Sequence, residues 1–128
     1  MKNIFFSLLA FLSLSVATAQ KPNKNSKKLL RHVVIFKYKE SSSPEDIKKV
    51  TESFVGLKKQ ISVVKDFEWG VNKSPEHFDQ GFTHCYVLTF ANEKDRDEVY
   101  QKHPAHKAFQ EVLKPHMDKV FVVDYWVE

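Results

Sequence analysis

Two histidines near the C-terminal end of the chain have a spacing suited to acid–base chemistry. In KHPAHKAF, residues 102–109, His103 and His106 flank Pro104 and Ala105. Proline is favoured at the first position of a helix, which makes His103 the N-cap and puts His106 in the first turn. The positive end of a helix disfavours an imidazolium, so we expect His106 to be neutral at pH 7 and able to act as a general base.

A metal site at the same pair is disfavoured. The two side chains flank a helix start and do not share one helical face. The sequence holds neither an H-E-x-x-H motif nor a cluster of cysteines with histidines. It also lacks a Gly-rich phosphate loop, a G-x-S-x-G elbow and a motif of paired carboxylates. We therefore expect no metal and no cofactor.

Other polar residues lie in apolar surroundings. Tyr100, six residues before His106, can donate a hydrogen bond to a substrate oxygen or oxyanion. Asp124 interrupts the apolar stretch KVFVVDYWV and needs a partner, such as a histidine that it orients. His32 and His84 each lie on an apolar strand face. A single histidine there is usually a core residue, but two of them near a third favour a pocket.

The strands that must position these residues are predicted from runs of β-branched and aromatic residues. They cover residues 30–39, 65–72, 81–90 and 119–127. Helical patterns separate the first strand from the second and the third from the fourth. The order β-α-β-β-α-β is the ferredoxin-like arrangement, so the predicted fold class is α+β with an antiparallel sheet.

The predicted helices have clear start signals. Ser43 is an N-cap and Pro44 a first helical residue, followed by about four turns whose apolar side is formed by Ile47, Val50, Phe54, Leu57 and Ile61. Asn92 is expected to cap a short, highly charged helix. The helix that opens at Pro104 should end near Pro115, and its apolar side carries Ala105, Phe109, Val112 and Leu113.

Both faces of the predicted strands are largely apolar. One face carries alternate residues that include Val34, Phe36, Tyr86, Leu88, Val120 and Val122, and the other includes Val33, Ile35, Cys85, Val87, Phe121 and Val123. Two helices cover only one face of an antiparallel sheet. The simplest cover for the other face is the same face of a second copy. We expect a homodimer through the sheet face.

The N-terminal residues differ from the rest of the chain. Lys2, an apolar run and the sequence Ala17-Thr18-Ala19 form the pattern of a signal peptide over residues 1–19, with cleavage after Ala19. Residues 20–29 are predicted to be a disordered basic linker, and residues 30–128 one domain. We therefore expect an exported protein, periplasmic or secreted, with no membrane attachment after cleavage.

Charge and cysteine content exclude two further classes. The formal charge is +4, but much of the excess lies in KPNKNSKK, residues 21–28, so the domain is near neutral and nucleic-acid binding is not expected. Cys85 is the single cysteine, which excludes an internal disulfide even in an oxidising compartment.

Several stretches together resemble the stress-responsive α/β-barrel (Dabb) family. They are RHVVIFKYK in the first strand, the W-G of the second, G-F-T-H at the start of the third, HPAHKAF, and the closing VFVVDY. The resemblance covers about residues 30–127. It implies a dimeric α+β barrel, in which two ferredoxin-like subunits pack their sheets face to face and each holds a pocket between sheet and helices.

The resemblance also assigns residues to that pocket. The family includes an enzyme that closes a linear polyketide by aldol condensation, and its catalytic tyrosine and histidine match Tyr100 and His106. His32 and His84 match its pocket histidines, and Asp124 matches an aspartate on its last strand. The predicted pocket therefore also includes the wall residues Val34, Phe36, Tyr86, Leu88, Phe109, Val120 and Val122.

Two hypotheses for the function remain open. In the first, the pocket of an exported homodimer binds a small organic molecule without catalysis, in a binding or stress-related role. In the second, the protein is a cofactor-independent acid–base enzyme that resembles the polyketide cyclase. His106 is then the base, oriented by Asp124 or by a backbone carbonyl, and Tyr100 is the oxyanion donor.

Overall fold

All the strands belong to one sheet, and the helices cover one of its faces. A computed structural model describes residues 28–128, so the predicted signal peptide and most of the predicted linker lie outside the described residues. The elements in chain order are β1 (Leu30–Tyr38), α1 (Pro44–Val55), α2 (Leu57–Gln60), β2 (Asp66–Val71), β3 (His84–Phe90), η1 (Asp95–Tyr100), α3 (Pro104–Leu113) and β4 (Met117–Trp126). Within residues 28–128, no helix is long and apolar enough to cross a membrane.

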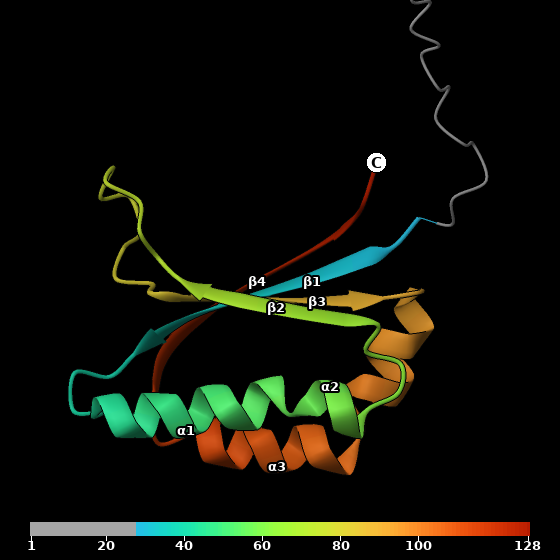
Figure 1. The fold of residues 1–128 in the computed structure, drawn as a ribbon, viewed down its shortest axis with the longest axis horizontal. Helices are drawn as coiled ribbons and strands as arrows, with labels where there is room; N and C mark the ends of the chain where they lie inside the picture. The colour runs from blue at the N-terminus through green and yellow to red at the C-terminus, as the bar shows by residue number, and fades with distance from the viewer. Residues whose placement is uncertain (1–27) are drawn as a thin grey trace, which may run out of the picture.

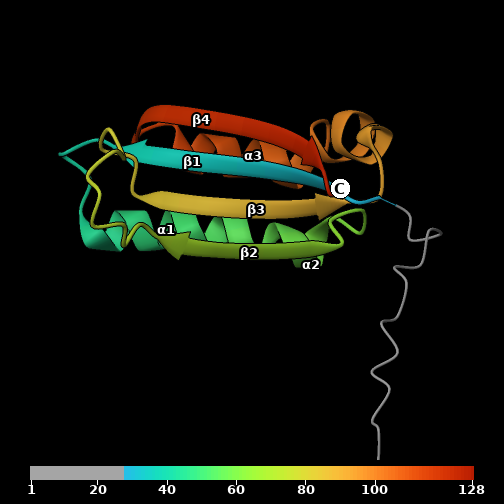
Figure 2. The same cartoon turned by 90° about the horizontal axis from the view of Figure 1, so that it is seen from above.

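The sheet has the strand order β2-β3-β1-β4, and every neighbouring pair is antiparallel. Figure 1 shows α1 and α3 packed side by side below the sheet, and Figure 2 shows the strands from above. Residues along β1 alternate strictly between buried and half-buried, because one face meets the helices and the other does not. The predicted α+β, ferredoxin-like fold is confirmed.

The start of α1 follows the predicted capping pattern. The Ser43 hydroxyl accepts a hydrogen bond from the backbone N–H of Asp46 at 3.1 Å, and the Asp46 carboxylate accepts one from the backbone N–H of Ser43. This reciprocal capping box satisfies two helix-end donors. The predicted four-turn helix is interrupted at Gly56, and α2 continues it with Leu57 buried.

Two predicted elements differ in detail. β3 begins at His84, three residues later than expected, because a turn precedes it in which Gly81 has φ +83° and Phe82 N–H donates to the Asp79 carbonyl. The charged segment after Asn92 forms a π-helix, η1. Its wide turn is closed by a hydrogen bond of 2.9 Å from Gln101 N–H to a carbonyl five residues earlier.

The core between the sheet and the helices is rich in aromatic side chains. Phe54 on α1 stacks on Phe109 of α3 with ring centroids 4.2 Å apart, and it lies 4.9 Å from the Tyr86 ring. Both Phe54 and Tyr86 are fully buried. On α3 Phe109 and Leu113 are buried as predicted, whereas Val112 faces outwards and is exposed.

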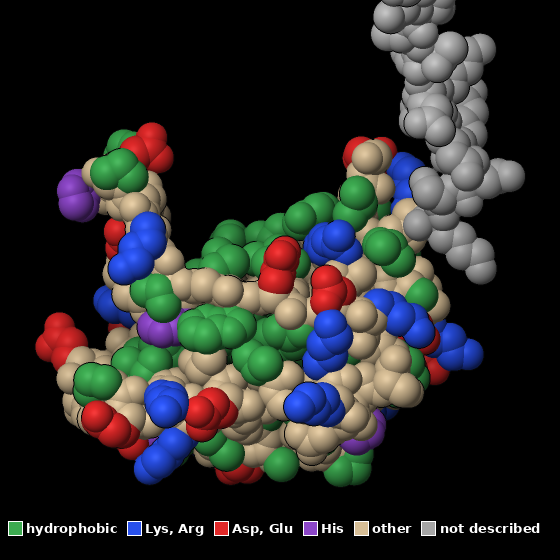
Figure 3. All heavy atoms as spheres, viewed as in Figure 1, with side chains coloured by type: hydrophobic (Ala, Val, Ile, Leu, Met, Phe, Trp, Pro, Cys, Tyr) green, Lys and Arg blue, Asp and Glu red, His purple; other side chains and the backbone are tan. Residues whose placement is uncertain are grey.

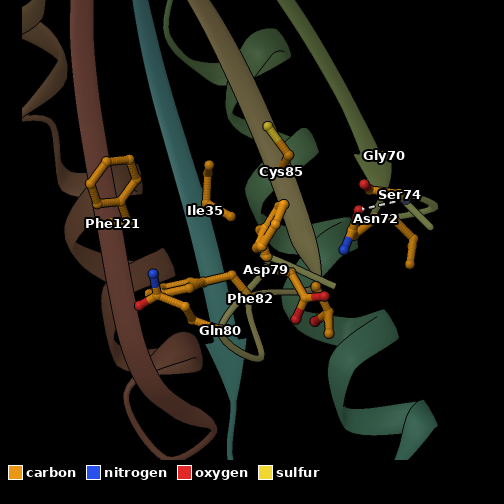
Figure 4. A pocket seen from close by; sticks show the side chains of 12 residues that line it. Ile35, Gly70, Asn72, Ser74, Asp79, Gln80, Phe82, Cys85 and Phe121 are labelled. Carbon is orange, nitrogen blue, oxygen red and sulfur yellow. Dashed lines mark hydrogen bonds between the residues drawn. The ribbon is translucent and has the colours of Figure 1, made fainter. Parts of the chain in front are cut away.

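The opposite face of the sheet is open. Its exposed residues include Phe121, Val123 and Tyr125 of β4, and Figure 3 shows hydrophobic side chains gathered above the sheet. A hollow of about 620 Å³ lies on this face beside the loop between β2 and β3. In Figure 4, Ile35, Cys85 and Phe121 line it from the strands. We call this surface the open face.

Candidate functional site

A pocket of about 430 Å³ lies on the helix side of β1 and β4, next to α3 and the end of η1. Many of the residues predicted to form a pocket line it, namely His32, Val34, Phe36, Tyr100, His106, Phe109, Val120 and Val122. Its wall is mostly apolar, and its polar side chains include those of Tyr100, His106 and His32. This arrangement is typical of small-molecule sites, in which an apolar cavity contains a few placed polar groups.

His106 is held in the position that its sequence context predicts. His103 is the N-cap of α3, and its Nδ1 accepts a hydrogen bond of 3.1 Å from Ala105 N–H. His106 is buried, and its Nδ1 lies 3.3 Å from the Gln101 carbonyl oxygen. A carbonyl only accepts, so Nδ1 carries the proton. In the neutral ring this leaves the Nε2 lone pair unprotonated.

The surroundings keep this imidazole neutral. Burial lowers the pKa of His106 below its ordinary value of 6.5, and the neighbouring His32 and His103 act in the same direction. The hydrogen bond to the Gln101 carbonyl opposes them but does not reverse the shift. A neutral imidazole with a free Nε2 can accept a proton or a hydrogen bond.

Tyr100 lies directly beside His106. The two ring centroids are 4.3 Å apart, and the Tyr100 side chain is almost fully buried. Burial raises the pKa of Tyr100, so its phenol stays protonated at neutral pH. Tyr100 and His106 both line the pocket, so a ligand oxygen there can accept a hydrogen bond from the phenol.

Asp124 orients His32 and does not touch His106. The His32 Nδ1 donates to Asp124 Oδ1 at 2.9 Å, and the Arg96 guanidinium Nη1 lies 3.1 Å from the same oxygen. Of the two orienting groups considered for His106, the structure therefore places the backbone carbonyl, that of Gln101, within reach. Arg96 and Gln101 were not singled out from the sequence. Arg96 lies in a charged segment of the kind that usually forms a solvent-exposed surface. Gln101 contributes its backbone carbonyl, which the identity of its side chain does not indicate.

Four predicted pocket residues do not line this cavity, namely Asp124 and the three β3 residues His84, Tyr86 and Leu88. Leu88 is buried in the core, and Tyr86 is buried with its hydroxyl bonded to Thr51 at 2.8 Å and to Tyr38 at 3.2 Å. His84 lines a separate groove between α1 and β2, where its ring lies parallel to that of Trp69. His84, Tyr86 and Leu88 share the helix-facing side of the sheet with the pocket residues, but they belong to β3, which lies beside β2 and is separated from β4 by β1.

The structure also shows how the side chains that commonly bind metal ions are distributed. Within residues 28–128, no three side chains of the types that commonly bind metal ions (His, Cys, Asp and Glu) lie close enough to hold one together. His32 and His106 line the same pocket, and each uses its Nδ1 for a hydrogen bond to a protein oxygen.

The lowered pKa of His106 predicts how stability depends on pH. When the pH falls below 6.5, the unfolded chain binds a proton at this histidine before the folded protein does, so the free energy of unfolding decreases. We expect His106→Gln to reduce this decrease, as measured by urea unfolding above and below pH 6.5. His84, whose pKa is also lowered by burial, keeps part of the slope. An identical slope in His106→Gln, or the same reduction in the exposed-loop control His77→Gln, would contradict the assignment.

Comparison with known proteins agrees with this fold. The sequence profile described as "Stress responsive A/B Barrel Domain" (Dabb) matches residues 30–127. The chain is 35% identical over 96 residues to the stress-response A/B barrel domain-containing protein HS1 of Arabidopsis thaliana, covering 75% of this chain and 87% of that protein. It is 26% identical over 96 residues to olivetolic acid cyclase of Cannabis sativa, covering 75% of this chain and 94% of the cyclase.

A solved structure supports the same assignment. A dimeric protein of ferredoxin-like fold from Bacteroides fragilis aligns with a TM-score of 0.63 and 27% identity, over 77% of this chain and 96% of that one. The sequence profile covers nearly all of the described domain, and the HS1 relative exceeds a third identity over most of both chains. The resemblance noted from the sequence is confirmed: the chain belongs to the stress-responsive A/B barrel (Dabb) family.

Proposed function

We propose that this protein is an exported homodimer whose pocket binds a small organic molecule. The observation that carries the proposal is that a neutral histidine and a protonated tyrosine lie side by side in one cavity. The Nε2 of His106 is available as an acceptor, and the Tyr100 hydroxyl is available as a donor. A pocket of about 430 Å³ with apolar walls suits a compact molecule with an apolar body and one polar end.

The polar end of the ligand can be specified further. Tyr100 donates and His106 accepts, so a hydroxyl next to a carbonyl, or an enolisable carbonyl group, satisfies both. His32 lines the same pocket, and its Nδ1 is already bonded to Asp124. The apolar end of the ligand would contact Val34, Phe36 and neighbouring side chains.

The homodimer is supported by the open face. Phe121, Val123 and Tyr125 together leave apolar surface exposed in a single copy, which soluble monomers rarely do over a whole sheet. The related protein from Bacteroides fragilis is described as dimeric. Pairing of two open faces would bury the apolar residues of both copies and leave each pocket, on the other side of the sheet, accessible.

Export is proposed from the sequence pattern alone. Residues 1–19 combine Lys2, an apolar run and the small residues Ala17 and Ala19 before the cleavage point. Expression of the full chain in a bacterium that secretes proteins, followed by N-terminal sequencing of the mature protein, is expected to give Gln20 as the first residue. A chain that keeps Met1 would contradict the export proposal.

Acid–base catalysis is the second candidate, because the same two groups fit its roles. His106 Nε2 would remove the proton from a carbon next to a ligand carbonyl, and the Tyr100 hydroxyl would donate a hydrogen bond to the enolate oxygen that forms. The enolate carbon would then take the proton back from the imidazolium. Alternatively, it would attack a second carbonyl of the ligand, and the alkoxide oxygen formed there would take that proton. Olivetolic acid cyclase, a relative at 26% identity, is an enzyme by its name, and this similarity supports the catalytic candidate.

Ligand binding can be tested with a panel of small hydroxyaryl ketones and related carbonyl compounds, screened by NMR chemical-shift changes. Compounds that bind the wild type are expected to bind Tyr100→Phe and His106→Ala about tenfold more weakly, the cost of one hydrogen bond. Lys107→Ala is a control, since Lys107 is exposed on α3 and does not line the pocket. Equal affinity in all variants, or no binder at all, would contradict the proposal.

Catalysis is separated from binding by an isotope experiment. A bound ketone in D₂O is expected to exchange its α-hydrogen for deuterium when His106 acts as a base. The His106→Ala variant would then lose the exchange under saturating ketone. Binding without exchange in the wild type would support the non-catalytic function and rule out this step.

A further inference from the structure

A single π-helical turn contacts each of the polar groups identified in the pocket. Tyr100 is the last residue of η1. Gln101 N–H donates at 2.9 Å to the Arg96 carbonyl, which closes the turn, and the Gln101 carbonyl accepts from His106 Nδ1. The Arg96 side chain reaches Asp124, which holds His32. Because π-turns are rare and often occur at functional sites, this concentration of contacts suggests a role beyond packing.

Arg96 is positioned to fix Asp124. Its side chain is 17% exposed, and its Nη1 lies 3.1 Å from Asp124 Oδ1. Its Nε and Nη2 donate to the two carboxylate oxygens of Asp97 at 2.6 and 3.1 Å. Asp97 thus anchors one edge of the planar guanidinium, and the remaining edge presents a donor to Asp124.

One carboxylate oxygen of Asp124 links β4, η1 and β1. It accepts from the guanidinium of Arg96 and from Nδ1 of His32. The Asp124 side chain is 28% exposed, so without a cation beside it the carboxylate could rotate towards water. His32 would then lose the acceptor that selects its Nδ1–H form.

We propose that Arg96 is a positioning residue for His32: by holding Asp124 in place, it keeps the proton of the neutral imidazole on Nδ1 and leaves Nε2 free to accept. The importance of this for a ligand rests on the proposed function, because His32 lines the same pocket as Tyr100 and His106. The tautomer itself is a property of the free protein. It can be measured without any ligand.

The experiment compares histidine tautomers by two-bond ¹H–¹⁵N correlation spectra of labelled protein, at a pH above the titration of its histidines. The wild type is expected to show the Nδ1–H form at His32. Arg96→Gln is expected to shift His32 towards the Nε2–H form. Arg96→Lys keeps a cation near Asp124 and should restore most of the wild-type pattern.

Glu98→Gln is the matched control, because it removes an exposed charge of η1 that neither Arg96 nor Asp124 contacts. It is expected to keep the wild-type tautomer at His32. A wild-type pattern in Arg96→Gln would overturn the proposal. So would an equal shift in Glu98→Gln, which would point to a general disturbance of η1. Neither outcome depends on whether a ligand binds, so this proposal and the ligand-binding proposal fail separately.

A measurement on the wild type covers the case in which Arg96→Gln does not fold. His32 Nδ1 and Arg96 Nη1 lie 2.9 and 3.1 Å from the same oxygen of Asp124. The Nη1 protons of Arg96 are therefore expected to give a separate, slowly exchanging NMR signal with a nuclear Overhauser contact to the Nδ1 proton of His32. Guanidinium signals that are averaged by free rotation, with no such contact, would overturn the proposal.

Discussion

Replacing Phe54 by alanine is expected to destabilise the domain by about 3–5 kcal/mol, which is a large part of the stability of a domain of this size. Phe54 is fully buried, and its ring stacks on Phe109 at 4.2 Å. It also packs against Tyr86, Phe67 and Phe36 with centroids 4.9, 5.1 and 5.8 Å away. These neighbours come from α3 and three strands, so no single movement can close the space that the ring leaves.

The size of this effect can be measured by urea unfolding at one fixed protein concentration, because association of the chain adds to its apparent stability. Val112→Ala is the control, since it truncates an apolar side chain that is 41% exposed on the outer side of α3, and a change within about 0.5 kcal/mol is expected. Phe54 also lines the pocket, so the cavity would grow at its inner end. A loss in Phe54→Ala no greater than in Val112→Ala would contradict the role of this ring in the core.

The parts of the fold that were predictable depend on local signals. Two helix starts are predicted from a capping residue followed by proline, Ser43 before Pro44 and His103 before Pro104. Ser43 and His103 are both N-caps in the structure. Capping and proline geometry involve only neighbours in sequence, so they need no knowledge of the tertiary fold. Strand alternation is local in the same way, and it assigned the residues of β1 and β4 to the correct sides of the sheet.

The parts that were not predictable depend on distances across the fold. Strand alternation gives the face of a residue but not its neighbour on the next element. His32 and His84 share the helix-facing side, yet one lines the pocket beside Tyr100 and the other lies in a groove beside Trp69. The pairing of Arg96 with Asp124 joins residues 28 positions apart through a π-turn, and no pattern in a charged segment indicates such a turn.

Tyr86 shows how contacts across the fold, which the sequence does not reveal, determine the extent of the pocket. It packs against Phe36 and Phe54, which line the pocket, and against Trp69, which lines the groove that contains His84. Its ring therefore lies between two cavities, whereas the sequence analysis predicted a single pocket. The hydrogen bonds of its hydroxyl hold it there, so the pocket is limited to the side of β1 and β4.

A charge at the centre of the open face is expected to break the proposed dimer. Val123 lies opposite Val33 in the register of β4 with β1, and its side is the one that faces away from the helices. In a dimer formed through these faces, Val123→Asp would bury two carboxylates against apolar surface, one from each copy. An unpaired buried charge costs several kcal/mol, so we expect dissociation to become at least about a hundredfold easier.

The effect of the charge must be distinguished from simple unfolding. Val123 is 40% exposed in the single chain, so a carboxylate there can remain hydrated in the monomer and the fold should survive. Val112→Asp is a close control, because Val112 is 41% exposed but lies on the outer side of α3, away from the open face. Sedimentation velocity is expected to show a dimer for the wild type and for Val112→Asp, and a folded monomer for Val123→Asp. A wild-type monomer, or a dimer that Val123→Asp leaves intact, would mean that the open face is covered in another way, and the proposed arrangement of two sheets would be wrong.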